Sequence, residues 1–530
     1  MAPDPERAQA GLRRSDPPTM DEPKPTQRTL ESGPAVEPAP TSPAPPQSTV
    51  RHSLDRSLVR GIAWTGAVKW FSQILSWVST IVVVRLLVPA DYGLIGMATT
   101  YLSLVALINE LGLGAAIITQ RDLSEDQIRQ INSVCVLLGL TGFVVSVAVA
   151  VPLSVFFRAP DLRGVITVMS LAYVISGFQT APAALLQREL RFKFLAVTEG
   201  LQSILQALAT VFLAIFGWGY WSIVLGGLLG TAFLTIVIVS ERWLWFAVPR
   251  LRSIGHALTF SWQILITRVS WWVSVRADYL IAGRMLGQSA LGVYSVASTM
   301  ALLPAEKITG LVSRVSFPLF SAVQHDQPGL RRYLLVLTEG LALAAFPLAF
   351  GLALVTDEFV FVVLGAKWAD AILPLRILAI LTTLRAIYPV VPQALTVIGG
   401  ARFIMWVGVS TAVVAPVAFY FGSWWGITGM AVTWCILQPS NVVPVYWLLK
   451  RRLDVGLGQY LRSLSPALTA SLAMALVVWL LKAMLPAAWP MRDRFIIEVF
   501  GGGSAYALVA LTVHRDRLQA LIDLLRPPRR

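Results

Sequence analysis

The sequence predicts an all-α integral membrane protein, and three observations support that fold class. The chain has 530 residues, of which 56% are hydrophobic, and its mean hydropathy is +0.67. Only 14% of the residues are charged, whereas a soluble globular chain carries about 25%. From Gly61 onward, apolar stretches alternate with short polar breaks. This composition excludes a soluble multidomain enzyme, a disordered regulator and a nucleic-acid-binding protein.

The first 55 residues differ from the rest of the chain, since they hold 12 of the 32 prolines and have no apolar periodicity. Such a segment cannot bury enough apolar area to offset the entropy lost on ordering. We therefore expect residues 1–55 to be a disordered, Pro-rich cytoplasmic tail. It lacks the apolar region of a secretory signal. A dispensable tail and a docking or regulatory tail remain alternatives.

The remaining chain contains apolar stretches of roughly 20–25 residues, the length that crosses about 30 Å of hydrocarbon as a helix. We predict about fourteen transmembrane helices, at 61–85, 92–113, 131–157, 164–186, 195–216, 218–240, 254–276, 290–316, 333–355, 371–398, 403–421, 425–449, 461–485 and 495–513. The connections are too short for the sizeable soluble module that a membrane enzyme joining sugars usually needs.

The basic residues predict the orientation of these helices. One set of breaks, together with the flanking ends of the chain, holds 23 Lys and Arg residues and the other set holds 8. Because basic loops stay in the cytoplasm, we expect both termini there. The sparse set, expected on the outer side, consists of Arg85, Arg158, Arg163, Arg276, Arg284, Lys367, Arg492 and Arg494.

An internal repeat relates two segments at an offset of 199 residues. The segment Arg85-Leu-Leu-Val-Pro-Ala-Asp-Tyr-Gly-Leu-Ile-Gly-Met-Ala98 corresponds to Arg284-Met-Leu-Gly-Gln-Ser-Ala-Leu-Gly-Val-Tyr-Ser-Val-Ala297. At the same offset Lys69 falls on Arg268. The offset covers six predicted helices, an even number, so both repeats have the same orientation. Two such halves are related by a pseudo-two-fold axis along the membrane normal.

The repeat divides the chain into parts. We predict an N-terminal six-helix bundle at 56–245 and a C-terminal six-helix bundle at 246–450. Two additional transmembrane helices and a basic cytoplasmic C-terminus follow at 451–530. Two bundles facing each other across a cavity could expose a midplane site to each side of the membrane in turn.

Three predicted helices carry polar stripes on one face. Their members recur every three or four residues, which places them on one side of a helix. They are Thr65, Lys69, Ser72, Ser76 and Thr80; Tyr92, Gly96, Thr99, Ser103, Ala106 and Glu110; and Glu199, Gln202, Gln206 and Thr210. Such a stripe faces either a hydrated cavity or a neighbouring helix, because Ser, Thr and Gln also form hydrogen bonds between membrane helices.

Two cations lie deep inside predicted helices. A Lys or Arg at the bilayer centre costs about 2.5–3.5 kcal/mol on insertion scales. Lys69 and Arg268 are paired by the repeat and could face a cavity from opposite bundles, where they would suit an anionic substrate such as a diphosphate. The alternative is an ion pair with a carboxylate such as that of Glu110, Glu199 or Glu306.

Other charged residues are weaker candidates. Arg85 and Arg284 could line the cavity, although their places near helix ends also suit snorkelling to the membrane surface. Glu110, Glu199 and Asp278 could be coupling or cavity carboxylates, and an interfacial anchor is the alternative for Asp278. Further charged residues inside predicted helices are Arg314, Arg376 and Arg385.

The aromatic residues Trp271 and Trp272 flank Arg268 and could stack on sugar rings, with helix packing as the default. Cys135 and Cys435 lie inside apolar runs and form no disulfide framework or metal motif. None of the four His residues belongs to a metal or catalytic motif, and no Walker loop occurs. We therefore expect neither an enzyme nor a bound cofactor or metal, and suspect an H⁺ or Na⁺ gradient as the energy source.

At this point the sequence resembles a known family. Arg85-Leu-Leu-Val-Pro-Ala-Asp-Tyr-Gly93, the run Glu110-Leu-Gly-Leu-Gly-Ala-Ala-Ile117, and Leu364-Gly-Ala-Lys-Trp368 are similar to motifs of the polysaccharide transporter branch of the multidrug/oligosaccharidyl-lipid/polysaccharide flippase superfamily. So are Leu291–Ala297 and Phe317–Ser321. The resemblance covers about residues 56–450.

The resemblance implies a flippase of undecaprenyl-diphosphate-linked oligosaccharide in the bacterial inner membrane, serving lipopolysaccharide O-antigen or exopolysaccharide assembly. Expected partners are this lipid-linked substrate, membrane lipid and polysaccharide polymerase or assembly proteins, with no nucleic acid. One alternative is a cation-coupled multidrug or metabolite extruder, whose cavity should be acidic. Another is a membrane-bound polymerase or ligase of lipid-linked glycan, which should carry a large outer loop.

Overall fold

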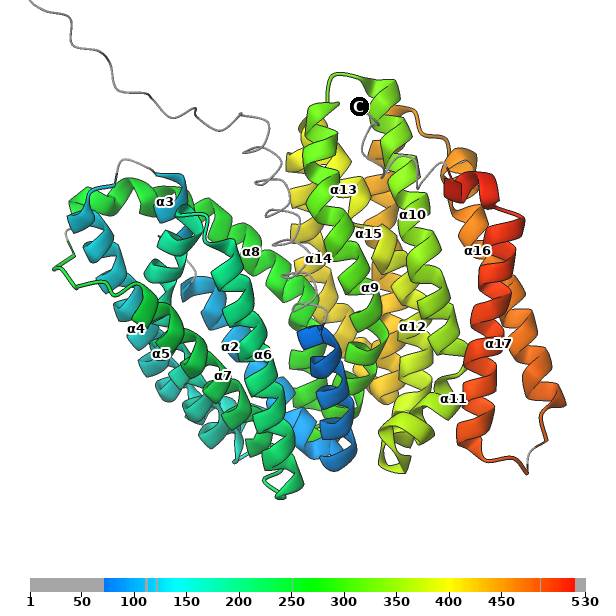
Figure 1. The fold of residues 1–530 in the computed structure, drawn as a ribbon, viewed down its shortest axis with the longest axis horizontal. Helices are drawn as coiled ribbons and strands as arrows, with labels where there is room; N and C mark the ends of the chain where they lie inside the picture. The colour runs from blue at the N-terminus through cyan, green and yellow to red at the C-terminus, as the bar shows by residue number, and fades with distance from the viewer. Residues whose placement is uncertain (1–70, 110–112, 121–122, 250, 487, 520–530) are drawn as a thin grey trace, which may run out of the picture. The chain divides into compact units, whose positions relative to one another are not determined.

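The computed structural model describes residues 71–109, 113–120, 123–249, 251–486 and 488–519. Every regular element in these ranges is a helix, which confirms the all-α fold class (Figure 1). Nine helical segments of the described chain are long and apolar enough to cross a membrane. One of them, Ala366–Leu453, contains α12, α14 and α15, so the number of fourteen spans stays a prediction. The predicted tail at 1–55 lies outside the described residues.

The first half contains a helix at Phe71–Leu86. It is followed by α2 (Pro89–Asn109), α3 (Leu113–Thr119), α4 (Glu125–Phe157), α5 (Leu162–Arg188), α6 (Phe192–Ile215) and α7 (Trp221–Glu241). Within this half α4 packs against α5, α6 against α7, and α5 against both α7 and α2.

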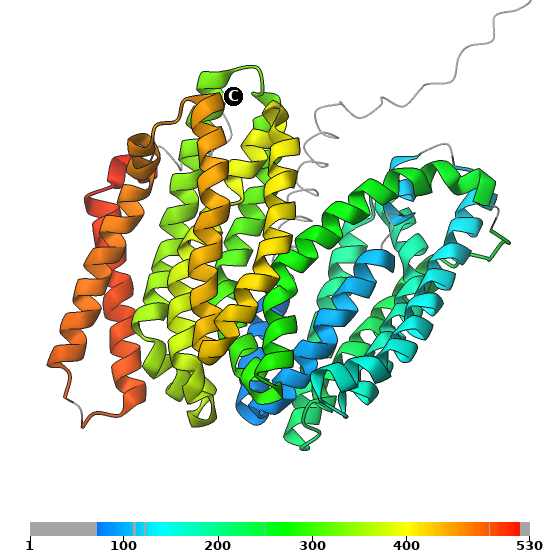
Figure 2. The same ribbon diagram turned by 180° about the vertical axis from the view of Figure 1, so that it is seen from behind.

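The second half begins with two long helices, α8 (Leu251–Met285) and α9 (Gln288–Ala322). It continues with α10 (Gln327–Leu354), α11 (Thr356–Phe359), η1 (Val360–Leu364), η2 (Ala366–Ala371), α12 (Ile372–Ile387), α13 (Val390–Leu395), η3 (Thr396–Gly400), α14 (Ala401–Gly422), η4 (Ser423–Trp425) and α15 (Gly426–Leu453). The helices α9, α10 and α15 pack around α12, and α14 packs against α15 (Figure 2).

Two C-terminal helices, α16 (Leu457–Met484) and α17 (Met491–Thr512), form an antiparallel pair. The pair packs against the second half mainly through α16 and α10. A hydrogen bond from the Tyr506 hydroxyl to the Leu343 carbonyl also joins α17 to α10, at 2.8 Å.

Local sequence signals explain several helix ends. Ser124 and Gln127 form a capping box at the start of α4, because each side chain accepts a hydrogen bond from the other residue's backbone N–H. Arg158 ends the same helix in the left-handed conformation. Asp326 caps α10 by accepting from the Gly329 N–H at 3.1 Å.

The predicted boundary between residues 276 and 290 was wrong. The helix α8 continues to Met285 and α9 begins at Gln288, so only Leu286 and Gly287 separate them. Gly287 has φ of 85°, a conformation that a glycine adopts without strain. Because Arg276, Asp278 and Arg284 are charged, they indicated a loop; they lie instead on the last three turns of α8.

The single helix predicted at 371–398 is interrupted. Its first part, α12, ends at Ile387, and a new short helix, α13, begins after Pro389. A proline ring clashes with the preceding turn of a helix and removes one backbone donor. Gly399, with φ of 82°, then bends the chain before α14.

Candidate functional site

The two halves meet where α2 and α9 begin. A Cβ atom added to Gly93 would overlap the backbone carbonyl oxygen of Gln288, and one added to Gly292 would overlap that of Pro89. Only glycine permits such close approach of two backbones. The Gln288 side-chain amide also donates to the Ala90 carbonyl at 2.9 Å. We call this contact the α2–α9 crossing.

The crossing is reciprocal. Gly93 and Gly292 differ by 199 residues, and so do Pro89 and Gln288, which is the offset of the sequence repeat. Each helix therefore offers the same glycine and the same backbone carbonyl to the other. A pseudo-two-fold axis between α2 and α9 produces this pattern of contacts.

The short helix η2 packs against the α2–α9 crossing. Trp368 is fully buried, donates from its indole N–H to the Val84 carbonyl at 3.0 Å, and packs edge-on against Tyr92 with ring centroids 5.6 Å apart. Lys367 donates to the Arg85 carbonyl at 2.7 Å. The Arg85 guanidinium donates in turn to the Val362 carbonyl at 3.0 Å. The structure thus places Arg85 in a contact between the halves.

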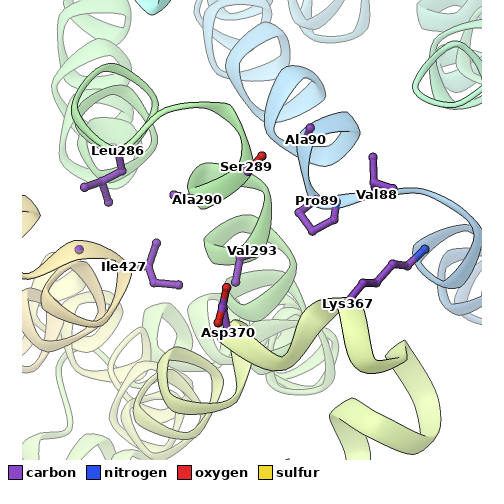
Figure 3. A pocket seen from close by; sticks show the side chains of 11 residues that line it. Val88, Pro89, Ala90, Leu286, Ser289, Ala290, Val293, Lys367, Asp370 and Ile427 are labelled. Atoms are coloured by element: carbon purple, nitrogen blue, oxygen red, sulfur yellow. The ribbon is translucent and has the colours of Figure 1, made fainter.

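A cavity of about 690 Å³ lies beside the crossing (Figure 3). Its lining joins the start of α2, the start of α9, η2 and the start of α15. The charged side chains in the lining are those of Lys367 and Asp370. Figure 3 shows that Ser289 and apolar residues such as Ala290 and Val293 form the rest of its wall.

A second polar cluster is buried inside the second half and centres on Asp278 of α8. One carboxylate oxygen accepts from the Tyr294 hydroxyl at 2.8 Å and from the Trp434 indole N–H at 3.1 Å. The other oxygen accepts from the Tyr279 backbone N–H at 2.8 Å. Asp278, Tyr294 and Trp434 are only 2%, 0% and 6% exposed. We call these four residues the Asp278 cluster.

Two arginines lie over aromatic rings of the Asp278 cluster. The Arg385 guanidinium carbon lies 3.8 Å from the ring centroid of Trp434, and that of Arg276 lies 5.3 Å from the ring centroid of Tyr279. Both distances are within the range of cation–π attraction. Arg385 comes from α12 and Arg276 from α8, and both are half-buried. This arrangement places two guanidinium groups around the buried Asp278 carboxylate, which attracts Arg385 electrostatically, inside the second half.

The helix α8 contacts both halves near this cluster. Trp272 is buried and donates from its indole N–H to the Ser103 hydroxyl of α2 at 2.8 Å. Ser274 donates to the Gly408 carbonyl of α14 at 3.3 Å. The structure therefore places Trp272 in helix packing, whereas Trp271 is 63% exposed.

The other predicted site residues are scattered. Arg268 is exposed on α8, and Glu199 is exposed on α6. The Arg284 guanidinium carbon lies 5.4 Å from the ring centroid of Phe156 at the end of α4. Lys69 and Glu110 lie outside the described residues. The structure therefore does not bring the predicted cations and carboxylates together in one described cluster.

The polar stripe on α6 packs against a neighbouring helix. A Cβ atom on Gly226 of α7 would overlap the Thr210 hydroxyl, and one on Gly230 would lie 3.0 Å from Gln206 Cβ. The α2 stripe instead meets the second half, through Tyr92 on Trp368 and Ser103 on Trp272. In the first predicted helix, Ser79 donates to the Ala207 carbonyl of α6 at 3.2 Å.

Sequence reasoning missed most of the Asp278 cluster. Asp278 was a candidate, and Arg385 was a candidate without a partner, but Tyr294, Trp434 and Arg276 were not singled out. Tyr294 lies inside the repeated segment 284–297, which was a usable signal. In the described part of the chain no three His, Cys, Asp or Glu side chains gather as metal ligands.

Comparison with solved structures defines the class of protein as a multi-span membrane protein with a transporter fold. The lipid II flippase MurJ in an inward closed conformation aligns with a TM-score of 0.71 at 15% identity, covering 86% of this chain and 100% of that one. An inward-facing multidrug resistance MATE family transporter of the MOP superfamily aligns with a TM-score of 0.56 at 16% identity. It covers 72% of this chain and 94% of that one.

The family follows from the sequence itself. Residues 82–373 match the family of polysaccharide biosynthesis proteins, and the chain belongs to that family. The succinoglycan biosynthesis transport protein ExoT of Rhizobium meliloti (strain 1021) is 26% identical, covering 89% of this chain and 96% of that protein. The lipopolysaccharide biosynthesis protein WzxC of Escherichia coli (strain K12) is 24% identical, covering 80% and 89%. These findings confirm the resemblance drawn from the motifs.

Proposed function

We propose that this protein is a flippase that moves undecaprenyl-diphosphate-linked oligosaccharide from the inner to the outer leaflet of a bacterial inner membrane. Its family, and relatives named for succinoglycan transport and lipopolysaccharide biosynthesis, support this proposal. So does the fold shared with a lipid II flippase. The product would enter O-antigen or exopolysaccharide assembly, with polymerase or assembly proteins as partners.

The α2–α9 crossing is the observation on which the mechanism rests. It holds one end of the two halves together by backbone contact at Gly93 and Gly292. The sparse basic residues Arg85, Arg284 and Lys367 lie at that end, so the charge distribution favours the outer side for it. The described state would then be closed to the outside, and transport would require the crossing to part while the opposite end closes.

Positive charge between the halves would attract the diphosphate, while the polyprenyl chain stays in lipid. Lys69 and Arg268 remain the proposed pair of deep cations, with Arg85 and Arg284 nearer the outer end. Stacking of sugars on Trp271 is compatible with its exposure. A path between the halves lined by these cations would be unfavourable for an extruder of organic cations.

We propose that an H⁺ or Na⁺ gradient drives the cycle, with Glu110, Glu199 or Asp278 as the coupling carboxylate. In inverted membrane vesicles, collapsing one gradient at a time with a selective ionophore should stop flipping for the coupled ion alone. Flipping that continues with both gradients collapsed would contradict this part of the proposal.

The flippase assignment is tested in a deletion strain. The lipid-linked oligosaccharide should accumulate, and it should be inaccessible to a membrane-impermeant glycan-modifying enzyme added to spheroplasts. A plasmid copy of the wild-type gene should restore export. Accumulation on the outer face would instead indicate a defect after flipping, as expected for a polymerase or ligase. Unchanged export with increased sensitivity to organic cations would indicate an extruder.

A further inference from the structure

We propose that Arg276 and Arg385 form the diphosphate-binding pair of the second half, and that the Asp278 cluster positions them. This inference rests on the flippase function proposed above and adds two binding residues to Lys69 and Arg268, the deep cations proposed there. Arg276 was expected in an outer loop, and Arg385 had no predicted partner. The structure joins them through one buried network.

Each arginine lies over an aromatic ring of the Asp278 cluster. A guanidinium that lies over a ring is held by cation–π attraction, which uses none of its five N–H donors. Arg385 and Arg276 lie over Trp434 and Tyr279 in this way. Their donors match the oxygens of a phosphate group, which a guanidinium binds through two parallel hydrogen bonds.

Neither arginine is paired with a carboxylate of the described residues. Several other basic side chains pair with carboxylates, including Arg376 with Asp357 and Lys482 with Glu358. Within the described ranges neither Arg276 nor Arg385 makes an ion pair or hydrogen bond with a carboxylate. The carboxylates of Asp278 and Glu306 both attract Arg385 electrostatically, Asp278 more strongly, but neither forms an ion pair with it. The donors of both arginines are thus available to a ligand.

Both arginines lie well inside their helices. Arg276 lies nine residues before Met285, the last residue of α8, which at 1.5 Å per residue is roughly 13 Å along the helix. Arg385 lies thirteen residues after Ile372, the first residue of α12, or roughly 20 Å. Both helix ends adjoin the α2–α9 crossing. The two arginines therefore lie within the membrane-spanning part, where a charged side chain is costly and indicates a functional site.

Arg276 lies on the side of α8 that faces the first half. Trp272 lies one turn before Arg276 on the same face of α8, and its indole reaches Ser103 of α2 in the first half. Arg276 therefore projects from the side of α8 that faces the other half. A diphosphate between the halves would lie within the field of both arginines, and two guanidinium groups suit its two phosphates.

The Asp278 cluster acts through the rings that carry the arginines. Its carboxylate accepts from the Trp434 indole and from the Tyr279 backbone, so it fixes the position of both aromatic residues. Tyr294 closes the network, since the Trp434 indole N–H also lies 3.0 Å from the Tyr294 hydroxyl oxygen. Asp278, Tyr279 and Trp434 are accordingly positioning residues, and the arginines are the binding residues.

Binding is tested with the full-length protein in lipid nanodiscs. The probe is undecaprenyl diphosphate, with undecaprenyl phosphate and undecaprenol as comparison ligands and anionic phosphatidylglycerol in the disc as competitor. Arg276→Gln and Arg385→Gln should each weaken diphosphate binding about 10-fold, and the double variant about 100-fold. Undecaprenol binding should not change. The matched control is Arg163→Gln, an exposed arginine at the start of α5, which should bind as the wild type does.

Conservative variants separate positioning from folding. Arg385→Lys keeps the charge but loses the planar fork, so the preference for diphosphate over monophosphate should fall. Trp434→Phe keeps a ring under Arg385 but loses the indole hydrogen bond to Asp278, so it should retain part of the binding. Trp434→Leu should lose as much as Arg385→Gln. Equal thermal stability of the two Trp434 variants would show that the stack, and not the fold, controls binding.

The binding measurements test the proposed diphosphate site separately from the proposed flippase function. Unchanged diphosphate binding in folded Arg276→Gln/Arg385→Gln protein would overturn the site, even if the deletion strain accumulates inner-leaflet intermediate. Equal loss for monophosphate, diphosphate and phosphatidylglycerol would also overturn it, because the arginines would then bind lipid headgroups in general. Selective loss of diphosphate binding would support the site, whatever the deletion strain shows about flipping.

Discussion

Gly93 and Gly292 occupy equivalent places in the two halves of the molecule. Each lies where a side chain would overlap a backbone carbonyl of the other helix, at Gln288 and at Pro89. The contact is backbone against backbone, so no rotamer change can relieve an added side chain. The crossing therefore exists only while both positions are glycine.

Replacing Gly93 by leucine should force the crossing apart. Overpacking of a tight contact costs roughly 1–3 kcal/mol, which would shift the balance between closed and parted states about 5- to 150-fold. We expect normal insertion but loss of polysaccharide export. The closed state can be measured by crosslinking Ala90→Cys to Gln288→Cys with a short bifunctional reagent, and the yield should fall in the leucine variant.

Gly227→Leu is the matched control, because a Cβ atom on this α7 glycine has no neighbouring atom within 4 Å. It should leave both export and crosslinking at the wild-type level. If Gly93→Leu crosslinks as efficiently as this control, the crossing is not the element that holds the two halves together.

The fold class and the equivalence of Gly93 and Gly292 could be anticipated from the sequence because both follow from local regularities. Hydropathy and segment length identify membrane helices wherever they occur in a chain. The 199-residue offset related Gly93 to Gly292 before any contact was known. What the offset could not supply was the contact itself, since a repeat fixes symmetry and not the distance from the axis.

The Asp278 cluster could not be anticipated in the same way. Asp278 and Trp434 are separated by 156 residues, and no periodic pattern relates them. The charge of Arg276 favoured a loop, but the helix continues there. Arg276 lies over the Tyr279 ring, and the nearby Asp278 carboxylate accepts three hydrogen bonds. The α6 stripe had two open interpretations, and only the small residues of α7 show that it packs against a helix.

Trp368 joins η2 to the chain before α2 and to Tyr92. We expect its replacement to destabilise the crossing, and the loss of stability to increase with the number of contacts removed. Trp368→Phe keeps a ring against Tyr92 but loses the hydrogen bond to Val84, which is worth about 1 kcal/mol. Trp368→Ala also empties a fully buried site and should cost about 3–5 kcal/mol. Thermal unfolding in detergent measures both variants, and equal effects would contradict the graded role assigned to the indole.

The α6–α7 contact should depend on the absence of a side chain at Gly226. Gly226→Val would place methyl groups against the Thr210 hydroxyl, so we expect destabilisation of roughly 1–3 kcal/mol. Thr210→Ala removes the obstructing hydroxyl and methyl groups and should recover part of that loss. A double-mutant cycle on thermal stability measures the recovery. Strictly additive effects would mean that the two residues do not touch.

A large stability effect should also come from Lys482, which holds the C-terminal pair of helices to the second half. Its ammonium group lies 2.8 Å from a carboxylate oxygen of Glu358 and 3.7 Å from one of Glu498. The Glu498 side chain is fully buried, and that of Glu358 is 5% exposed. Lys482→Met would leave two carboxylates buried without their cation, at a cost of about 3–5 kcal/mol.

Arg191→Met provides the comparison, because Arg191 and its partner Glu241 are both exposed and such a pair contributes about 0–1 kcal/mol. Adding Glu358→Gln and Glu498→Gln to Lys482→Met should restore much of the lost stability, since no charge is then stranded. Protease cleavage between α15 and α16 would report detachment of the pair directly. If Lys482→Met unfolds at the same temperature as Arg191→Met, water reaches the two carboxylates and the pair is held by apolar packing around Met474 and Val478 alone.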